Sequence, residues 1–325
     1  LFFHQDINFK SRLDLKPLQE HVEAIKKEIG KIIVGQNEMI ELLIISILSN
    51  GHTLIEGVPG VAKTITAKLL AKTLAVGFSR IQFTPDLMPS DILVSEILVH
   101  DRKFKFIKGP IFSNILLADE INRTPPKTQA ALLEAMQERS VTIAGHHYEL
   151  DAPYFVLATQ NPIEQEGTYP LPEAQLDRFM FSINLTYPTF EEEVQVVKLT
   201  TTSSHAEVDV VFSAEDILKF QSLIRKIPVA DNVIDYAVKM VGKTRPNSIN
   251  ATALVNQYVD WGAGPRASQN LILAAKTFAV INNKLSPDIE DVQSVAKGIL
   301  RHRIIKNYKA ESDGISIESI IENLF

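Results

Sequence analysis

Residues 57–64 have the spacing of a loop that holds phosphate groups. The loop ends in Lys63 and Thr64, and it lies between a short apolar stretch at 52–56 and a predicted helix over 65–74. Backbone amides in such a loop surround phosphate oxygens at the N-terminus of the following helix, where the helix dipole favours negative charge. Lysine at this position reaches the β- and γ-phosphates, and the next threonine binds Mg²⁺. The segment therefore predicts a site for a nucleotide.

The loop departs from the usual pattern at one position. Ala62 stands where G-x-x-x-x-G-K-[ST] has its second glycine. A pattern loosened in this way also fits an ordinary lysine in a loop before a helix. Gly60 and the strand-before, helix-after context favour the nucleotide site. We expect a bound nucleotide to contact Gly57, Pro59, Gly60, Val61, Ala62, Lys63, Thr64, Ile65 and Asp119.

A second candidate group stands at the end of an apolar stretch. Residues 115–118 are all apolar and are followed by Asp119 and Glu120. Carboxylates at the carboxyl edge of a parallel sheet lie where ligands bind in α/β folds. The pair predicts Asp119 as a ligand of Mg²⁺ and Glu120 as the base that orients the attacking water. A strand that ends in two solvated acids is the alternative, and the preceding phosphate loop weakens it.

Asn161 follows another apolar stretch, at 155–159. An amide at a strand end can lie beside the γ-phosphate and hold the attacking water, although Asn-Pro is also a plain turn dipeptide. On this segment alone the turn is favoured.

Two arginines complete the candidate chemistry. Arg178 precedes the stretch at 179–185, and Arg266 opens a predicted helix. A guanidinium that meets developing phosphate charge raises rates by about 10³–10⁵, whereas a surface ion pair contributes about 0–1 kcal/mol. Asp177 lies beside Arg178, so the residues alone leave both interpretations open.

Alternating strands and helices must position these groups. Strands over 52–56, 80–83, 115–118, 155–159 and 179–185 with helices between them predict a parallel sheet with helices on both faces. Residues 92–106 and 140–150 predict inserted β-hairpins. After Pro188 the strand signals stop, so we place a domain boundary near 187, with an α/β nucleotide-binding domain and N-terminal helices over 1–187 and helices over 188–325. Helices are predicted over 17–30, 37–49, 65–74, 126–139, 189–201, 213–226, 231–243, 266–282 and 287–299.

Composition excludes several classes of protein. The net charge is 33 − 39 = −6, which argues against broad binding to nucleic acid. The chain has no cysteine, so it has no disulfide framework and no cysteine-ligated metal, and it fits a reducing cytoplasm. No apolar stretch approaches the roughly 20 residues that cross a bilayer.

The order of these groups resembles that of AAA+ ATPases. Residues 80–91, 117–138 and 158–179 resemble the MoxR family in particular, and the resemblance covers about residues 33 to 300. It implies an AAA+ P-loop domain, with a parallel sheet flanked by helices and β-hairpin inserts, followed by a smaller all-α lid domain. The family's functional residues match this sequence as follows: Lys63 and Thr64 the Walker A lysine and Mg²⁺ ligand, Asp119 and Glu120 the Walker B pair, Asn161 sensor 1, Arg178 an arginine finger acting on the neighbouring subunit's nucleotide, and Arg266 sensor 2 acting within its own subunit.

The resemblance also implies a function. It predicts ATP hydrolysis with Mg²⁺ by a ring, expected to be a hexamer, in which hydrolysis moves the lid against the α/β domain. The family acts as chaperones that mature or activate partner complexes, often with von Willebrand factor A domain proteins.

Four other functions compete with this one. An ATP-gated scaffold with little turnover is the first, and Glu120 argues against it. A small-molecule kinase would need an acceptor pocket and has no use for an interface arginine. A GTPase would need N-K-x-D, which is missing because 283–286 lacks the aspartate. A DNA-remodelling motor is disfavoured by the acidic net charge.

Overall fold

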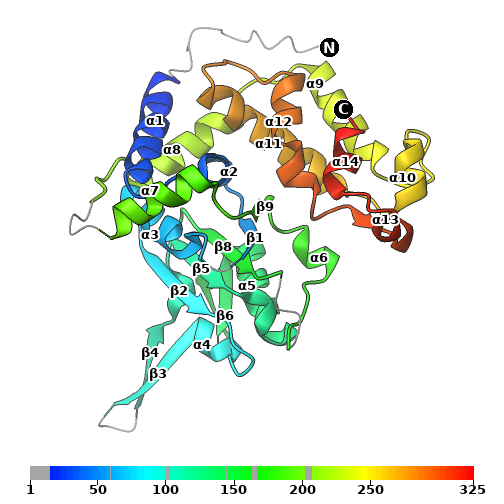
Figure 1. The fold of residues 1–325 in the computed structure, drawn as a ribbon. Helices are drawn as coiled ribbons and strands as arrows, with labels where there is room; N and C mark the ends of the chain where they lie inside the picture. Colours follow the sequence, from blue (N-terminus) through cyan, green and yellow to red (C-terminus); the bar gives the residue numbers. More distant parts are fainter. Residues whose placement is uncertain (1–14, 59, 100–102, 144, 163–166, 202–206) are drawn as a thin grey trace, which may run out of the picture.

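The computed structural model describes residues 15–58, 60–99, 103–143, 145–162, 167–201 and 207–325, and of 95–99 and 103–107 it describes the backbone alone. Its centre is a five-stranded parallel sheet in the order β2-β5-β8-β1-β9 (Figure 1). This sheet confirms the predicted α/β class. The strands are β1 (Thr53–Gly57), β2 (Phe78–Gln82), β5 (Ile115–Asp119), β8 (Phe155–Gln160) and β9 (Phe181–Leu185).

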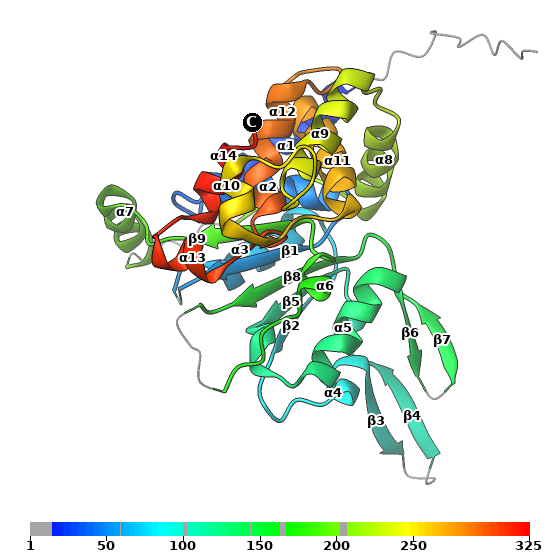
Figure 2. The same cartoon turned by 90° about the vertical axis from the view of Figure 1, so that its right-hand side faces the viewer.

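Two apolar cores cover the two faces of the sheet. Along β5, Leu117 belongs to one core, while Leu116 and Ala118 belong to the other. The first core includes α3 (Lys63–Thr73) and the second includes α5 (Pro126–Glu138), and Figure 2 shows these helices on opposite sides of the sheet. Every residue of β5 is buried, which explains its unbroken run of apolar residues.

Two β-hairpins project from the sheet domain, as predicted. β3 (Val94–Val99) pairs with β4 (Lys103–Lys108), and β6 (Ser140–Ile143) pairs with β7 (His146–Glu149), both antiparallel. Figure 2 shows that both extend from the same end of the molecule, beyond α5 and α4 (Pro89–Leu93) and away from the C-terminal helices.

The chain after β9 is mainly helical. The helices predicted there are confirmed, with bounds that differ by at most two residues. Helix α11 begins at Pro265, whose fixed φ suits a first helical turn. Helix α12 begins with reciprocal hydrogen bonds between Asp288 and Asp291. The helices are α7 (Phe190–Thr200), α8 (Ala214–Arg225), α9 (Asp231–Lys243), α11 (Pro265–Ile281) and α12 (Ile289–Leu300).

The expectation that strands stop after Pro188 is wrong at one place. β10 (Val259–Trp261) and β11 (Ile305–Lys306) form a small antiparallel sheet. The sequence also did not predict the short helices α6 (Glu173–Leu176), α10 (Ala253–Tyr258), α13 (Tyr308–Ser312) and α14 (Ile317–Glu322). Elements this short contain too few residues for a hydrophobic period to be recognised.

The first two helices join the sheet to the C-terminal helices. α1 (Lys16–Gly30) packs against α3 and α11, and α2 (Asn37–Leu48) packs against α8, α11 and β9. The apolar core that includes α3 therefore continues from its face of the sheet into α11 and α12. The division at 187 stays a prediction, and the two parts share this core. Within the described residues, no helix is long and apolar enough to cross a membrane.

His52 ties β1 to two neighbouring elements. Its Nε2–H donates to the carbonyl oxygen of Met136 at 3.1 Å, and its Nδ1 accepts from the backbone N–H of Val156 at 3.0 Å. This pattern requires the neutral ring. Burial lowers the pKa of His52 to about 3, and the charge of Arg139 contributes.

We expect the unfolding free energy of the wild type to fall as the pH drops below 6.5, the ordinary pKa of histidine. The unfolded chain then takes up a proton at His52, whereas the folded protein resists this until about pH 3. The stability that depends on the neutral ring is therefore complete above pH 6.5 and is lost as the pH falls toward 3. Between about pH 6 and 4, a His52→Gln variant should lose stability less steeply, by about 1 kcal/mol per pH unit. Denaturant unfolding of both proteins over this range measures the difference, and parallel pH profiles would contradict the prediction.

Candidate functional site

The loop between β1 and α3 has the backbone shape of a phosphate loop. Gly60 and Ala62 both adopt left-handed conformations, with φ of 87° and 59°. This region is strained for a residue with a Cβ, which explains why glycine is usual at the second position. Ala62 keeps the conformation despite its side chain, so the departure in sequence is not a departure in shape. Pro59, expected to contact ATP, lies outside the described residues.

Lys63 closes the loop at the start of α3. Its Nζ donates to the carbonyl oxygen of Gly57 at 2.8 Å, so the ammonium group lies against the opposite end of the loop. Burial lowers the pKa of Lys63, while the nearby charges of Asp119 and Glu120 act in the opposite direction. The side chain is thus already turned toward the space in front of the loop amides.

A cavity of about 380 Å³ lies in front of this loop. The structure brings the loop, the acidic pair and the strand-end amide together around it, although they are far apart in the sequence. Its size is within the usual range for small-molecule sites, about 300–1,000 Å³. It is lined by Gly60, Val61, Ala62, Lys63, Thr64, Ile65, Asp119, Glu120 and Asn161.

Asp119 is buried at the end of β5 and held by two partners. The Thr159 hydroxyl donates to its Oδ1 at 2.6 Å. Arg80 on β2 donates to its Oδ2 through Nη2 at 2.6 Å and Nε at 3.1 Å. These contacts fix the carboxylate toward the cavity that it lines.

The donors at this cavity suit Mg²⁺, which prefers oxygen ligands. The Thr64 hydroxyl and the Asp119 carboxylate both line it. Each carboxylate oxygen has two lone pairs, so Asp119 keeps acceptor capacity beyond the bonds from Thr159 and Arg80.

Glu120 is held differently from Asp119. Its backbone has φ of 58°, which turns the chain sharply at the end of β5, and its N–H donates to the Thr159 hydroxyl at 2.9 Å. Gln82 Nε2 donates to its Oε2 at 2.9 Å, and Arg123 Nη1 lies 3.1 Å from the same oxygen. Both of these side chains therefore contact Oε2 of the carboxylate.

Sequence reasoning missed these supporting side chains. Arg80 and Gln82 lie on β2, which pairs directly with β5, so that Gln82 is opposite Asp119. Thr159 is the penultimate residue of β8, on the other side of β5. The order of the strands in the sheet would have identified these side chains as neighbours of the acidic pair. That order is set by packing, and here it differs from the order of the strands along the chain.

Arg178 and Arg266 lie at a second cavity, of about 320 Å³. Residues 50–52, which lead into β1, line it, whereas the phosphate loop follows the other end of β1. Strands rise about 3.3 Å per residue, so five-residue β1 separates the two cavities by roughly 15 Å. The arginines therefore lie at the opposite edge of the sheet from the phosphate loop.

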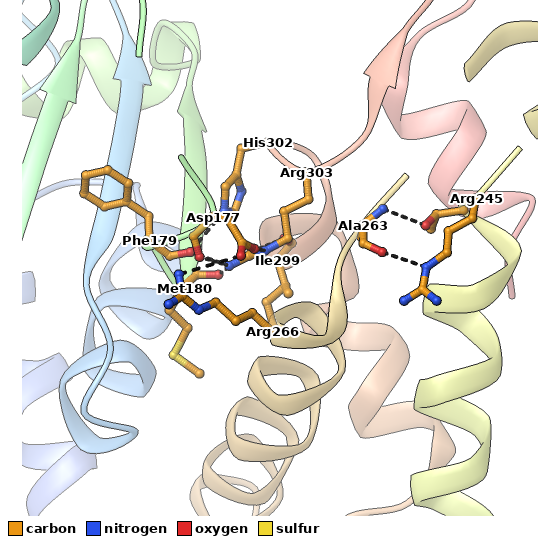
Figure 3. A network of polar contacts seen from close by, with 10 residues as sticks. Asp177, Phe179, Met180, Arg245, Ala263, Arg266, Ile299, His302 and Arg303 are labelled. Atoms are coloured by element: carbon orange, nitrogen blue, oxygen red, sulfur yellow. Dashed lines mark hydrogen bonds and ion pairs between the residues drawn. The ribbon is translucent and has the colours of Figure 1, made fainter. Parts of the chain in front are cut away.

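Arg266 is expected to act within its own subunit, but it lines the second cavity and not the one at the phosphate loop. Action within its own subunit would require it near the phosphate loop. Instead its Nη1 lies 3.8 Å from Oδ2 of Asp177, next to Arg178, and Figure 3 shows it reaching toward Asp177 from α11. The sequence could not reveal this, because the docking of the lid on the sheet decides which edge Arg266 reaches.

The second cavity is strongly basic. Arg139 and Arg225 line it together with Arg178 and Arg266, and Asp177 is the single acid among the described lining residues. Burial lowers the pKa of Arg139, and Arg225 adds to this effect. Guanidinium groups gathered with so little compensating charge suit an anionic group such as phosphate.

The chain is similar to known proteins over most of its length. A model of the ATPase family associated with various cellular activities (AAA) matches residues 52–181, and a model of the AAA lid domain matches 251–324. The chain is 44% identical over 299 residues to Chaperone MoxR1 of Mycobacterium tuberculosis, covering 91% of this chain and 79% of that relative. It is 29% identical over 298 residues to Protein MoxR of Methylorubrum extorquens, covering 86% of each. The crystal structure of a proposed ATPase from Cytophaga hutchinsonii has a TM-score of 0.88 and 46% identity, covering 94% of this chain and 93% of that one.

We expect Lys63→Ala to weaken ATP binding by at least about tenfold, because a charge-assisted bond to phosphate contributes about 1.5–3 kcal/mol. Titration of a fluorescent ATP analogue measures the change. Lys68→Ala is the matched control, since Lys68 is exposed on the same helix and does not line the cavity. Equal affinities for the two variants would contradict the assignment of the loop.

Proposed function

This chain belongs to the MoxR family of AAA+ ATPases, and from that premise we propose that it hydrolyses ATP to ADP and phosphate in a ring of identical subunits and uses the cycle to remodel or activate partner protein complexes. The observation that carries the proposal is the placement of the phosphate loop and the acidic pair in one cavity, with two arginines at the opposite edge of the sheet.

The residues of the first cavity divide the chemistry among them. The loop amides and Lys63 bind the phosphates, as helix N-termini and ammonium groups do. Thr64 and Asp119 would hold Mg²⁺, which neutralises charge on the phosphates when bound. Glu120 orients the attacking water at its carboxylate and accepts its proton, and Asn161 helps to hold that water.

The position of the second cavity is the reason that we propose a ring. Arg178 and Arg266 cannot reach the chain's own phosphate loop across β1, so we propose that both act on the nucleotide of the adjacent subunit. A contact between opposite edges of identical subunits is heterologous, and such contacts form closed rings when the rotation closes. A hexamer is the ring that the family resemblance implies.

The client side of the proposal rests on the relatives. The Mycobacterium tuberculosis relative is named a chaperone, and we extend that role to this chain. The two hairpins project together, away from the lid, which suits contact with a client. A von Willebrand factor A domain protein is the partner class that the resemblance implies.

An ATP-gated scaffold is the second candidate. Gln82 and Arg123 both engage the Glu120 carboxylate, and a protein that kept this arrangement with ATP bound would turn over slowly. Measured turnover separates the two functions.

We expect the ATPase rate per subunit to rise with protein concentration as rings form. Glu120→Gln and Arg178→Ala should each lower this rate by at least about 100-fold, since a missing base or a missing arginine finger has effects of that order. Glu134→Gln, an exposed glutamate on α5, serves as the control. ATP binding without turnover at any concentration would favour the scaffold and contradict the hydrolytic ring.

Arg80 should compete with Mg²⁺ for Asp119, because its guanidinium bonds to Oδ2. Replacing it by glutamine removes that positive charge, and we expect the Mg²⁺ concentration needed for half-maximal ATP binding to fall by about threefold or more. The measurement is a Mg²⁺ titration of ATP affinity at low temperature, with Lys68→Gln as a control for net charge. An unchanged or higher Mg²⁺ requirement would show that Arg80 supports the metal site more than it opposes it.

A further inference from the structure

The Arg303 side chain donates five hydrogen bonds to other described residues. Its side chain is only 2% exposed, and it follows α12 in the lid. Its Nε donates to Oδ1 of Asp177 at 2.7 Å, and its Nη2 donates to the carbonyl oxygens of Asp177 at 3.0 Å and Phe179 at 2.6 Å. Its Nη1 donates to the carbonyl oxygens of Met180, at 3.2 Å, and Ile299 (Figure 3). A buried guanidinium needs such partners, because its charge is otherwise costly.

Four of these five acceptors belong to one short segment, residues 177–180, and Arg178 lies inside it. The segment joins α6 to β9 and belongs to neither. Its N–H groups are bound by local turns and by His52, but the carbonyls of Asp177, Phe179 and Met180 are bound from the lid by Arg303. The backbone that carries Arg178 is therefore shaped by a side chain 125 positions later in the sequence.

Asp177 also connects Arg303 to Arg266. Its Oδ1 accepts from Arg303, and its Oδ2 faces Arg266 at 3.8 Å. Two hydrogen bonds hold Ala263, which lies in the loop before Arg266. The carbonyl oxygen of Ala263 accepts from Arg245 at 3.0 Å, and the N–H of Ala263 donates to the Thr244 hydroxyl at 2.9 Å (Figure 3). One carboxylate thus contacts both Arg303 and Arg266, and it belongs to the residue that precedes Arg178 in the chain.

From this network we infer that Arg303 and Asp177 are positioning residues: through them the lid of one subunit orients Arg178 toward the nucleotide of the next. The inference rests on the proposed trans-acting ring. Arginine is required because its planar fork reaches several acceptors at fixed angles, whereas the single ammonium of lysine does not. Arg303→Lys should therefore keep the positive charge but no longer hold the backbone of residues 177–180 in its present conformation.

Rings that mix two inactive subunits test this inference. Lys63→Ala subunits lack a working phosphate loop but donate an intact Arg178, and Arg178→Ala subunits have the reverse defect. Mixed rings should regain ATPase activity at sites where an Arg178→Ala subunit meets a Lys63→Ala neighbour. Arg303→Lys is then added to one type of subunit at a time, and ring size is checked by light scattering.

Arg303→Lys in the Lys63→Ala subunit, which donates Arg178, should lower the regained rate by at least about tenfold, since displacement of a reacting group by about 1 Å can cost 100-fold. The same change in the Arg178→Ala subunit should leave the regained rate unchanged. Asp177→Asn should show the same asymmetry and serves as a second variant in case Arg303→Lys folds poorly. The matched control is Arg301→Lys, whose guanidinium bonds to Glu318 within the lid at 2.8 Å, and it should have no effect in either subunit.

Equal losses of ATPase rate from Arg303→Lys in the two types of subunit, or no loss in either, would overturn the inference. A residue with a general structural role would affect both types of subunit alike. Absence of any regained activity in the starting mixture would overturn the trans-acting ring itself and the inference with it.

Discussion

The common direction of the five strands determines what each edge of the sheet can do. Because all five are parallel, the chain leaves β1, β5 and β8 at the same edge, which places the phosphate loop, the acidic pair and Asn161 around one cavity. Thr159 connects these strand ends, since its hydroxyl donates to Asp119 and accepts from the N–H of Glu120. The position of the acidic pair is therefore set by the register of β5 and β8.

The same direction places the second cavity at the opposite end of β1 from the phosphate loop. Segments that enter strands gather at the other edge, and residues 50–52 and 177–180 are two of them. The first cavity has acids and one lysine, whereas the second has four arginines and one acid. Among the described residues, the charged side chains that line the first cavity sum to 1 − 2 = −1 and those that line the second to 4 − 1 = +3, so two copies that meet edge to edge would bring opposite charges together and leave positive charge for phosphate. In this way an acidic chain keeps a local surface that suits phosphate.

The sequence predicted the longer helices and strands and most of the residues that line the first cavity, but not the contacts between distant segments. The phosphate loop, Asp119, Glu120 and Asn161 were found because their spacing within short stretches reflects strand ends and helix starts. The positions of Arg80 and Gln82 depend on strand order, and that of Arg266 depends on how the lid docks. Arg303 gave no signal, because one arginine after a helix is ordinary until its burial is known. The strands β10 and β11 are too short to show a period.

The buried guanidinium of Arg303 restricts how the lid can move. Separating the lid from β9 would break four hydrogen bonds from Arg303 to residues 177–180 and expose their carbonyls. The apolar core shared by α2, α11 and α12 adds to the cost of separation. A lid that rotates during a nucleotide cycle must therefore carry the Arg178 segment with it. The family resemblance implies movement of the lid against its own sheet, and the bonds to Arg303 oppose that motion. In the proposed ring, movement of one subunit's lid and arginines against the next subunit's phosphate loop would preserve every one of these bonds.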